Sequence, residues 1–211
     1  MIYELRTSTV RQRSLSEAVK AAGILSLEIR KEHYGKLEGC WQTEIGPLNQ
    51  VMELWSYQNL NQRAQLLGEL SANPGWSAEY LRLFHPHLIH QEIRLLNGVR
   101  APKAPVQTPN IYEFRNYRTT PGAVPRWLQL FTSVLEVREK YTRMAGLWAT
   151  EAPQVNEVCH IWVYSDLNAR AAARAALLED PDWQDFLRDS TGLLEELHST
   201  IMLPAPHSPL K

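Results

Sequence analysis

The sequence predicts an α+β fold made of two tandem ferredoxin-like units, each with the order β-α-β-β-α-β and an antiparallel sheet. Two observations predict it. Residues 39–64 recur at 146–171 with a constant offset of 107, and 12 of the 26 aligned positions are identical. Each copy also lies within the same succession of strand and helix patterns. A repeat of about 100 residues indicates one structural unit built twice.

The first unit combines patterns of period two, typical of strands, with patterns of period 3.6, typical of helices. Gly46-Pro47 separates two strand patterns and predicts a hairpin, and Gly35 is the expected stop of the preceding helix. Asn59 is expected to cap the next helix. In order, we expect a strand Ile2–Arg6, a helix Ser14–Tyr34, strands Lys36–Glu44 and Leu48–Tyr57, a helix Asn59–Leu70, a short helix Trp76–Phe84 and a strand Leu88–Leu96.

The pattern restarts after a stretch with three prolines in nine residues, which predicts an extended linker. Ile111–Arg115 matches Ile2–Arg6 at an offset of 109. The change of offset from 109 to 107 predicts a two-residue deletion between Arg115 and the end of the following helix, which Pro121 is expected to open. The last strand is expected at Leu193–Leu203. The predicted boundaries are residues 1–100 for the first unit, 101–109 for the linker, 110–204 for the second unit and 205–211 for a tail.

Composition is that of an ordinary globular protein, with 44% hydrophobic and 21% charged residues. Lys and Arg number 22 against 23 acidic residues, so we expect no nucleic-acid partner. No apolar run approaches the ~20 residues needed to span a bilayer, and no integral membrane segment is expected. The first residues lack a signal-peptide pattern, which indicates a cytoplasmic protein, although a processed organellar form would look the same.

Neither a metal nor a cofactor is expected. Cys40 and Cys159 stand at non-equivalent positions of the repeat, and buried free thiols are the simpler interpretation. The spacing of three histidines, His85, His87 and His90, suggests a metal site. Their rings are not expected to converge on one ion, because Pro86 and the predicted change from helix to strand separate them. The chain also has no Ser-centred elbow, phosphate loop or dinucleotide fingerprint.

The repeated motif resembles the NIPSNAP family. In the first copy it is carried by Trp41, Thr43, Glu44, Gly46, Leu48, Asn49, Val51, Leu54, Trp55, Tyr57 and Arg63. In the second copy it is carried by Trp148, Glu151, Asn156, Val158, Trp162, Tyr164, Arg170 and Arg174. The copies depart from one another where Pro153 stands for Gly46 and Leu67 for Arg174. Asp180-Pro181-x-Trp183 and the final Ser208-Pro209-Leu210-Lys211 also look like that family.

The resemblance implies a dimeric α+β barrel, in which two ferredoxin-like units pack sheet to sheet, and a homodimer. The two tandem units could close one barrel within the chain, or each could pair across a dimer, and the sequence does not decide. The family has been connected with vesicle traffic and mitochondrial quality control in animals, and its bacterial members lack a firm activity. The resemblance therefore implies no reaction.

Alternation along the strands sorts side chains onto two faces. The apolar face, with Met52 and Leu54, is expected to pack on the helices. The opposite face would then line the barrel interior and form the candidate ligand site, with Glu4, Arg6, Glu53, Trp55, Glu113, Arg115, His160 and Trp162.

Two interpretations of this polar face stay open. Glu4 with Arg6 and Glu113 with Arg115 could form a structural charge network, the usual fate of buried charge. Alternatively, apolar walls with a few convergent polar groups would form a small-molecule cavity. His160 is then the candidate acid/base residue, because its pKa could lie near neutrality and because Glu53 occupies its place in the first copy.

Residues that both copies share are more simply explained by the fold. Arg63 and Arg170 are expected to clamp the hairpin to the helix through Glu44 and Glu151. The four tryptophans of the repeated motif are expected in the core or at an interface, at Trp41, Trp55, Trp148 and Trp162.

Three functional hypotheses follow. The first is a protein that binds a small apolar or aromatic ligand in its barrel. The second is a cofactor-independent oxygenase- or isomerase-like enzyme with His160 as its acid/base group. The third is an interaction module for protein partners, including a second copy of itself. Fold class does not choose among them.

Overall fold

The computed structural model describes residues 1–106 and 110–211. Its strands close into one antiparallel barrel in the order β1-β3-β2-β8-β5-β7-β6-β4. The chain order of the strands is β1 Ile2–Val10, β2 Lys36–Ile45, β3 Gln50–Tyr57, β4 Leu88–Arg100, β5 Ile111–Thr119, β6 Arg143–Ala152, β7 Glu157–Tyr164 and β8 Leu194–Pro204.

The barrel closes within the chain, which answers the question that the sequence left open. Strand β2 of the first half pairs with β8 of the second, through Trp41↔Pro204 to Ile45↔Ile201. On the other side β4 pairs with β6, from Leu95↔Ala152 onward. Since both seams join the two halves, barrel closure requires no second copy of the chain.

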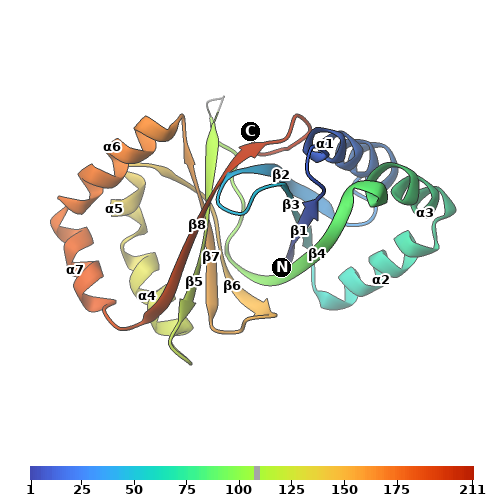
Figure 1. Cartoon of the computed structure of the whole chain (residues 1–211). Coiled ribbons are helices and arrows are strands. Elements are labelled where there is room, and N and C mark those ends of the chain that lie inside the picture. The colour runs from blue at the N-terminus through green and yellow to red at the C-terminus, as the bar shows by residue number, and fades with distance from the viewer. Residues whose placement is uncertain (107–109) are drawn as a thin grey trace.

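Helices cover two opposite flanks of the barrel (Figure 1). The first flank holds α1 Leu15–Ile24, its π-helical continuation Leu25–Arg30, α2 Leu60–Ala72 and α3 Pro74–Glu79, which continues as a π-helical turn Tyr80–Phe84 and a 3₁₀ turn His85–His87. The second flank holds α4 Val124–Ser133, α5 Leu135–Glu139, α6 Leu167–Leu178 and α7 Pro181–Asp189.

Side-chain caps start equivalent helices in the two halves. Asn59 accepts a hydrogen bond from the Gln62 amide at the start of α2, as expected from the sequence. Asp166 does the same for α6 through the Ala169 amide. A carboxamide or carboxylate at the N-cap satisfies an amide that has no partner within the helix.

The barrel interior is a single apolar core built by both halves. Aromatic contacts cross between the halves in a symmetric way: Tyr3 packs edge-on against Trp148 at 5.8 Å, and Trp41 packs against Tyr112 at 5.6 Å. An eight-stranded barrel is just wide enough for side chains to fill. The interior cluster consists of Tyr3, Leu5, Trp41, Met52, Leu54, Leu96, Tyr112, Phe114, Ala145, Trp148, Cys159, Ile161, Val163, Met202 and Leu210.

The expected orientation of the strand faces was therefore wrong. Met52 and Leu54 point into the barrel, whereas Glu53 accepts a hydrogen bond from Ser26 of the helical layer. The charged face, with Glu4, Arg6, Glu53, Trp55, Glu113, Arg115, His160 and Trp162, lies under the helices. The reason is that the closed barrel interior takes the more apolar face, where Glu157 at the start of β7 pairs with Arg94, while the helical layer leaves room for the other charged groups to find partners.

Most elements appear where the sequence places them, with three differences. The helix predicted over Ser14–Tyr34 ends at Arg30 after its π-helical part. Pro121 lies in a turn, and the next helix begins at Val124, with Pro125 in its first turn. The strands predicted to end at Arg6 and at Leu96 continue to Val10 and to Arg100.

Residues 205–211 follow β8 and pack on the barrel (Figure 1). The Ser208 hydroxyl accepts a hydrogen bond from the Cys40 amide at 2.9 Å, and the Ala205 amide donates to the Cys40 carbonyl. Leu210 joins the interior cluster. Of the predicted linker, residues 107–109 lie outside the described residues. Across the described ranges, no helix is long and apolar enough to cross a membrane.

Candidate functional site

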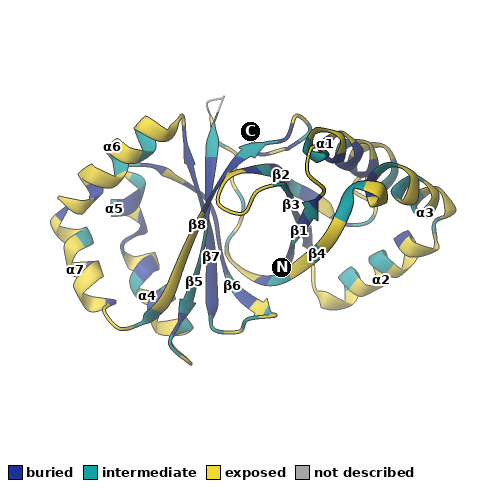
Figure 2. Ribbon diagram, in the orientation of Figure 1, coloured by how far each residue is buried: buried dark blue, intermediate teal, exposed yellow. Residues whose placement is uncertain are grey.

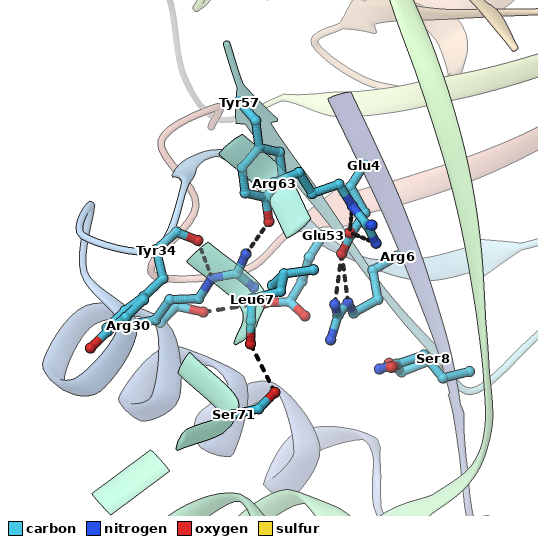
Figure 3. Close-up of polar contacts among 12 residues, drawn as sticks. Glu4, Arg6, Ser8, Arg30, Tyr34, Glu53, Tyr57, Arg63, Leu67 and Ser71 are labelled. Atoms are coloured by element: carbon cyan, nitrogen blue, oxygen red, sulfur yellow. Dashed lines mark hydrogen bonds and ion pairs between the residues drawn. The ribbon is translucent and has the colours of Figure 1, made fainter. Parts of the chain in front are cut away.

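Two related polar layers lie between the barrel and its helices, one in each half. In the first half (Figure 3), Glu4 on β1 is fully buried and accepts from Arg6 at 2.7 Å and from Arg63 of α2. Burial opposes ionisation of the Glu4 carboxyl, but the two guanidinium groups outweigh it and lower its pKa.

Glu113 on β5 holds the same place in the second half. It accepts from Arg115 at 3.0 Å, from Arg170 of α6 at 2.6 Å and from Ser199 at 2.6 Å. Burial opposes ionisation here too, and the hydrogen bonds from Arg170 and Arg115 lower the pKa of Glu113 to about 2. Each buried carboxylate is thus an anchor between the sheet and a helix.

The expected clamp therefore exists with a different acid. Arg63 and Arg170 pair with Glu4 and Glu113 on the first strand of each half, and not with Glu44 and Glu151 of the hairpin. Glu44 is exposed, and Glu151 accepts from Asn97 at 2.7 Å.

A buried arginine stacks on the second tryptophan of each repeat. The Arg30 guanidinium lies 3.4 Å from the Trp55 ring centre and donates to the Tyr57 hydroxyl (Figure 3). Arg138 lies 4.1 Å from the Trp162 ring centre and donates to the Tyr164 hydroxyl at 3.1 Å. Such contacts place a cation on the negative face of an aromatic ring.

The first layer is filled and contains a second carboxylate. Glu53 lies among Arg6, Arg30 and Ser26, and a space of only about 20 Å³ remains there. Burial raises the pKa of Glu53, and the charges of Arg6 and Arg30 oppose that shift without cancelling it. Leu67 of α2 is drawn beside this cluster in Figure 3.

His160 replaces Glu53 in the second layer. Its Nδ1 accepts from the Trp162 indole at 2.7 Å, and because an indole N–H can only donate, the proton of the neutral ring lies on Nε2. Burial, and then the charges of Arg115 and Arg138, hold the pKa of His160 well below its usual range. His160 is therefore a neutral hydrogen-bond donor in this layer.

An open cavity of about 210 Å³ lies over His160 between β5, β7 and β8 and the helices of the second flank. Aromatic rings gather around the imidazole: Tyr117 at 4.9 Å, Phe131 at 5.3 Å and Trp127 at 6.1 Å between ring centres. The lining residues are Arg115, Tyr117, Trp127, Phe131, Arg138, His160, Trp162, Arg174, Leu177, Leu178, Trp183, Phe186, Leu187, Ser190, Leu194 and Leu197.

The structure thus divides the eight predicted site residues between the halves. Glu4, Arg6, Glu53 and Trp55 belong to the filled first layer. Arg115, His160 and Trp162 line the second cavity, and Glu113 lies directly beneath Arg115 in the ion-pair network. The eight residues share one face of the sheet, as the alternation predicts, but this face lies under the helices and not inside the barrel.

Sequence reasoning missed the helical half of the site. Tyr34 and Tyr141 match at an offset of 107, and this offset aligns Arg138 with Lys31. In the structure, however, Arg138 performs the role of Arg30, which corresponds to an offset of 108. One residue of the two-residue length difference therefore falls after this arginine. The apolar stripe of Trp127 and Phe131 on α4 was a usable signal, since such a stripe marks the buried side of a helix.

The remaining candidates are the histidines, the cysteines and the motif tryptophans. No group of three His, Cys, Asp or Glu side chains in the described ranges could hold a metal ion, and His85, His87 and His90 do not converge. Cys40 and Cys159 are buried free thiols, as expected, and burial raises the pKa of each. The four motif tryptophans are all in the core.

A family model, NIPSNAP, matches residues 3–99 and again residues 112–209. The chain belongs to the NIPSNAP family. NipSnap homolog 2 of Homo sapiens is 26% identical to this NIPSNAP chain over 215 residues, which cover 100% of it and 75% of the human protein. The NipSnap protein of Drosophila melanogaster is 27% identical over 218 residues, covering 99% and 78%.

Solved structures show the same fold. A putative monooxygenase from Lactobacillus acidophilus has a TM-score of 0.71 over 97% of the NIPSNAP chain and 93% of its own, at 12% identity. At that identity the likeness concerns the fold alone. A nipsnap family protein with unknown function from Agrobacterium tumefaciens is 36% identical and covers 48% of this chain and 94% of its own, with a TM-score of 0.47.

Proposed function

We propose that this NIPSNAP protein binds a small apolar or aromatic molecule in the cavity of its second half. The carrying observation is the difference between two otherwise equivalent layers: about 20 Å³ of space in the first and about 210 Å³ in the second. Aromatic walls with a few polar groups are the usual anatomy of a ligand site. The volume fits a ligand of one or two rings.

Calorimetric titration with 2-naphthol, a neutral aromatic probe, tests this proposal. Leu177→Trp should abolish the binding heat, since Leu177 lines the cavity from α6 and an indole there would occupy the space. Leu48→Trp is the matched control, because Leu48 is exposed in the β2–β3 turn. Binding of 2-naphthol that survives Leu177→Trp in a folded variant would place the ligand elsewhere.

An acid/base enzyme is the alternative use of the same cavity. Two solved proteins with this fold, at 12% and 9% identity, are described as putative monooxygenases. The lowered pKa of His160 argues against it as a general base at neutral pH, because a weakly basic imidazole takes up a proton poorly. Its Nε2 proton suits ligand recognition better, and we therefore place binding before catalysis.

We also propose that the chain forms a homodimer and that its two halves are ferredoxin-like units. Helices leave the outer faces of β4 and β8 uncovered (Figure 2), and Ile89 and Leu197 are each 59% exposed there. The first part of β4 and of β8 pairs on one side only, with β1 and β5. Sedimentation over a wide concentration range tests the dimer, and a monomer at every concentration would exclude it.

A cytoplasmic location stays a prediction that fractionation of cells would test.

A further inference from the structure

The second cavity contains an unusual surplus of hydrogen-bond donors. Among its lining residues, four buried nitrogens have no partner in the described part of the chain: Arg115 Nε, Trp127 Nε1, Arg138 Nη1 and His160 Nε2. All four are donors, given the His160 tautomer that Trp162 imposes. Trp127, Arg138 and His160 are each only 1% exposed. Leaving such groups unpaired is costly, so the missing partner is an acceptor.

The charges of the two layers point the same way. In the first layer, Glu53 lies beside Arg6 and Arg30 in the lining of the small space. In the second layer, Arg115, Arg138 and Arg174 line the cavity, and the lining contains no carboxylate among the described residues. Glu113 pairs with Arg115, and its oxygens already accept from Arg115, Arg170 and Ser199.

Arg138 is the group with the least compensation. It stacks on Trp162 and donates to Tyr164, but it forms no ion pair with any described residue. Its counterpart Arg30 has the Glu53 carboxylate close by and donates to the Tyr34 carbonyl at 3.0 Å. The nearby charge of Glu113 compensates Arg138 only in part, because Glu113 already pairs with Arg115 and Arg170, so an anion entering the cavity would supply the counter-charge that Arg138 lacks.

Two of the sequence differences at the cavity change the charge in the same direction. His160 stands where the first half has Glu53, and Arg174 stands where it has Leu67. The first exchange removes a negative charge from the floor, and the second adds a positive charge at the exposed rim on α6. Around them, Glu113, Arg170, Arg138 and Trp162 have counterparts of the same residue type in the first half: Glu4, Arg63, Arg30 and Trp55.

We propose that the ligand of this cavity is an anion: an apolar or aromatic molecule with one carboxylate. The proposal rests on the proposed function and names the chemistry of its ligand. The carboxylate accepts from Arg138 Nη1 and His160 Nε2, with Arg174 at the rim, and the ring packs against Trp127, Phe131 and Trp183. Two of these residues, His160 and Arg174, differ from their counterparts Glu53 and Leu67 in the first half, which agrees with a site in the second layer alone.

A pair of isosteric probes tests the charge separately from the ring. The full chain is titrated with 2-naphthoate and with 2-naphthamide at pH 7, and binding is measured by calorimetry. The Kd of the carboxylate should be roughly tenfold or more lower than the Kd of the amide, because charge-assisted hydrogen bonds are about twice as strong as neutral ones. Equal affinity, or tighter binding of the amide, would overturn the anion proposal and leave the proposed function standing. If neither probe nor 2-naphthol binds, the proposed function itself fails.

Two variants rebuild the first layer within the second. His160→Glu should abolish the preference for 2-naphthoate while 2-naphthamide still binds, and the first half shows that a carboxylate is accommodated at this position. Arg174→Leu, at an exposed position, should reduce the preference roughly threefold with no change in thermal stability. Arg126→Leu on the exposed face of α4 is the control, since it removes the same charge away from the cavity. A preference for 2-naphthoate over 2-naphthamide that survives in both variants would contradict the placement of the carboxylate near His160 and Arg174. If His160→Glu does not fold, the result for Arg174→Leu decides alone.

Discussion

Glu4 and Glu113 each connect a strand to a helix, because Glu4 on β1 accepts from Arg63 of α2 and Glu113 on β5 accepts from Arg170 of α6. The two carboxylates occupy equivalent strand positions, with Trp55 opposite Glu4 and Trp162 opposite Glu113 across the ladder. A buried carboxylate of this kind is stable only while its arginine partners are present. Acid should therefore weaken both halves through the same residue type.

Glu113→Gln should lower the free energy of unfolding at pH 7 by roughly 3–5 kcal/mol, since it removes a fully buried carboxylate and leaves two half-buried guanidinium groups without their counter-charge. The pKa of Glu113 in the folded protein, about 2, lies below its unfolded value. Its stabilisation is therefore complete above the unfolded pKa of about 4.3 and is lost as the pH falls toward 2. Urea denaturation at pH steps from 7 to about 2 should show a flatter acid limb in the variant. Glu195→Gln, at an exposed site, is the control, and an unchanged acid limb would contradict the role of Glu113.

His160 should produce a separate loss of stability as the pH falls, and this loss should begin at a higher pH than the loss caused by Glu113. Its pKa is lowered on folding, so the unfolded chain takes up a proton first as the pH falls below about 6.5. The stability that the neutral ring contributes is present above that pH and decreases below it, by up to about 1.4 kcal/mol per pH unit. His160→Gln should remove this slope, whereas the exposed His198→Gln should not. A wild-type slope that persists between pH 6.5 and 5 in His160→Gln would show that another group titrates there.

At the scale of elements, the sequence specified boundaries better than faces. The cap at Asn59 is a local signal that acts within a few residues, whereas Gly35, with a φ of 101°, lies in a turn beyond the end of the helix at Arg30 and is not its stop. Which strand face becomes the interior depends instead on barrel closure, because β2 meets β8 and β4 meets β6 over long sequence separations. Alternation alone shows that two faces differ and not where each one points. The site was half predicted for the same reason. Its strand residues follow the repeat, while Trp127 and Phe131 come from a helix with no matching sequence in the first half, and Arg138 matches Arg30 only after a change of offset.

The bulges of β2 and β6 give a prediction at this scale. The register shifts at Gly39 and Gly146, and a Cβ at either position would lie 2.1 Å from the Trp41 ring or 2.3 Å from the Trp148 ring. Gly39→Ala and Gly146→Ala should each destabilise the protein by roughly 1–3 kcal/mol through overpacking.

Gly68→Ala is the matched control for these bulge variants. Gly68 lies inside α2, and a Cβ there would meet no atom within 4 Å. This variant should be more stable than the wild type by roughly 0.5–1 kcal/mol, because alanine loses less backbone entropy in a helix. Thermal denaturation followed by circular dichroism measures the stability of all three glycine-to-alanine variants. A stable Gly39→Ala variant would show that the indole can move aside and that the glycine is not required by packing.

At the scale of the whole molecule, the two halves share one interior and should unfold together. Trp41 of β2 packs on Tyr112 of β5, and both belong to the same buried cluster. Trp41→Ala should lower the global stability by roughly 3–5 kcal/mol. In hydrogen exchange, amides of β5 and β7 in the second half should lose as much protection as those of β1 and β3, since exchange from a cooperative core requires global unfolding. Trp76→Ala provides the contrast: Trp76 stacks on Tyr80 in the helical layer of the first half, and its loss should reduce protection mainly near α3. Protection that falls only in β1 and β3 after Trp41→Ala would mean that each half folds by itself and that the closed barrel is an assembly of two independent units.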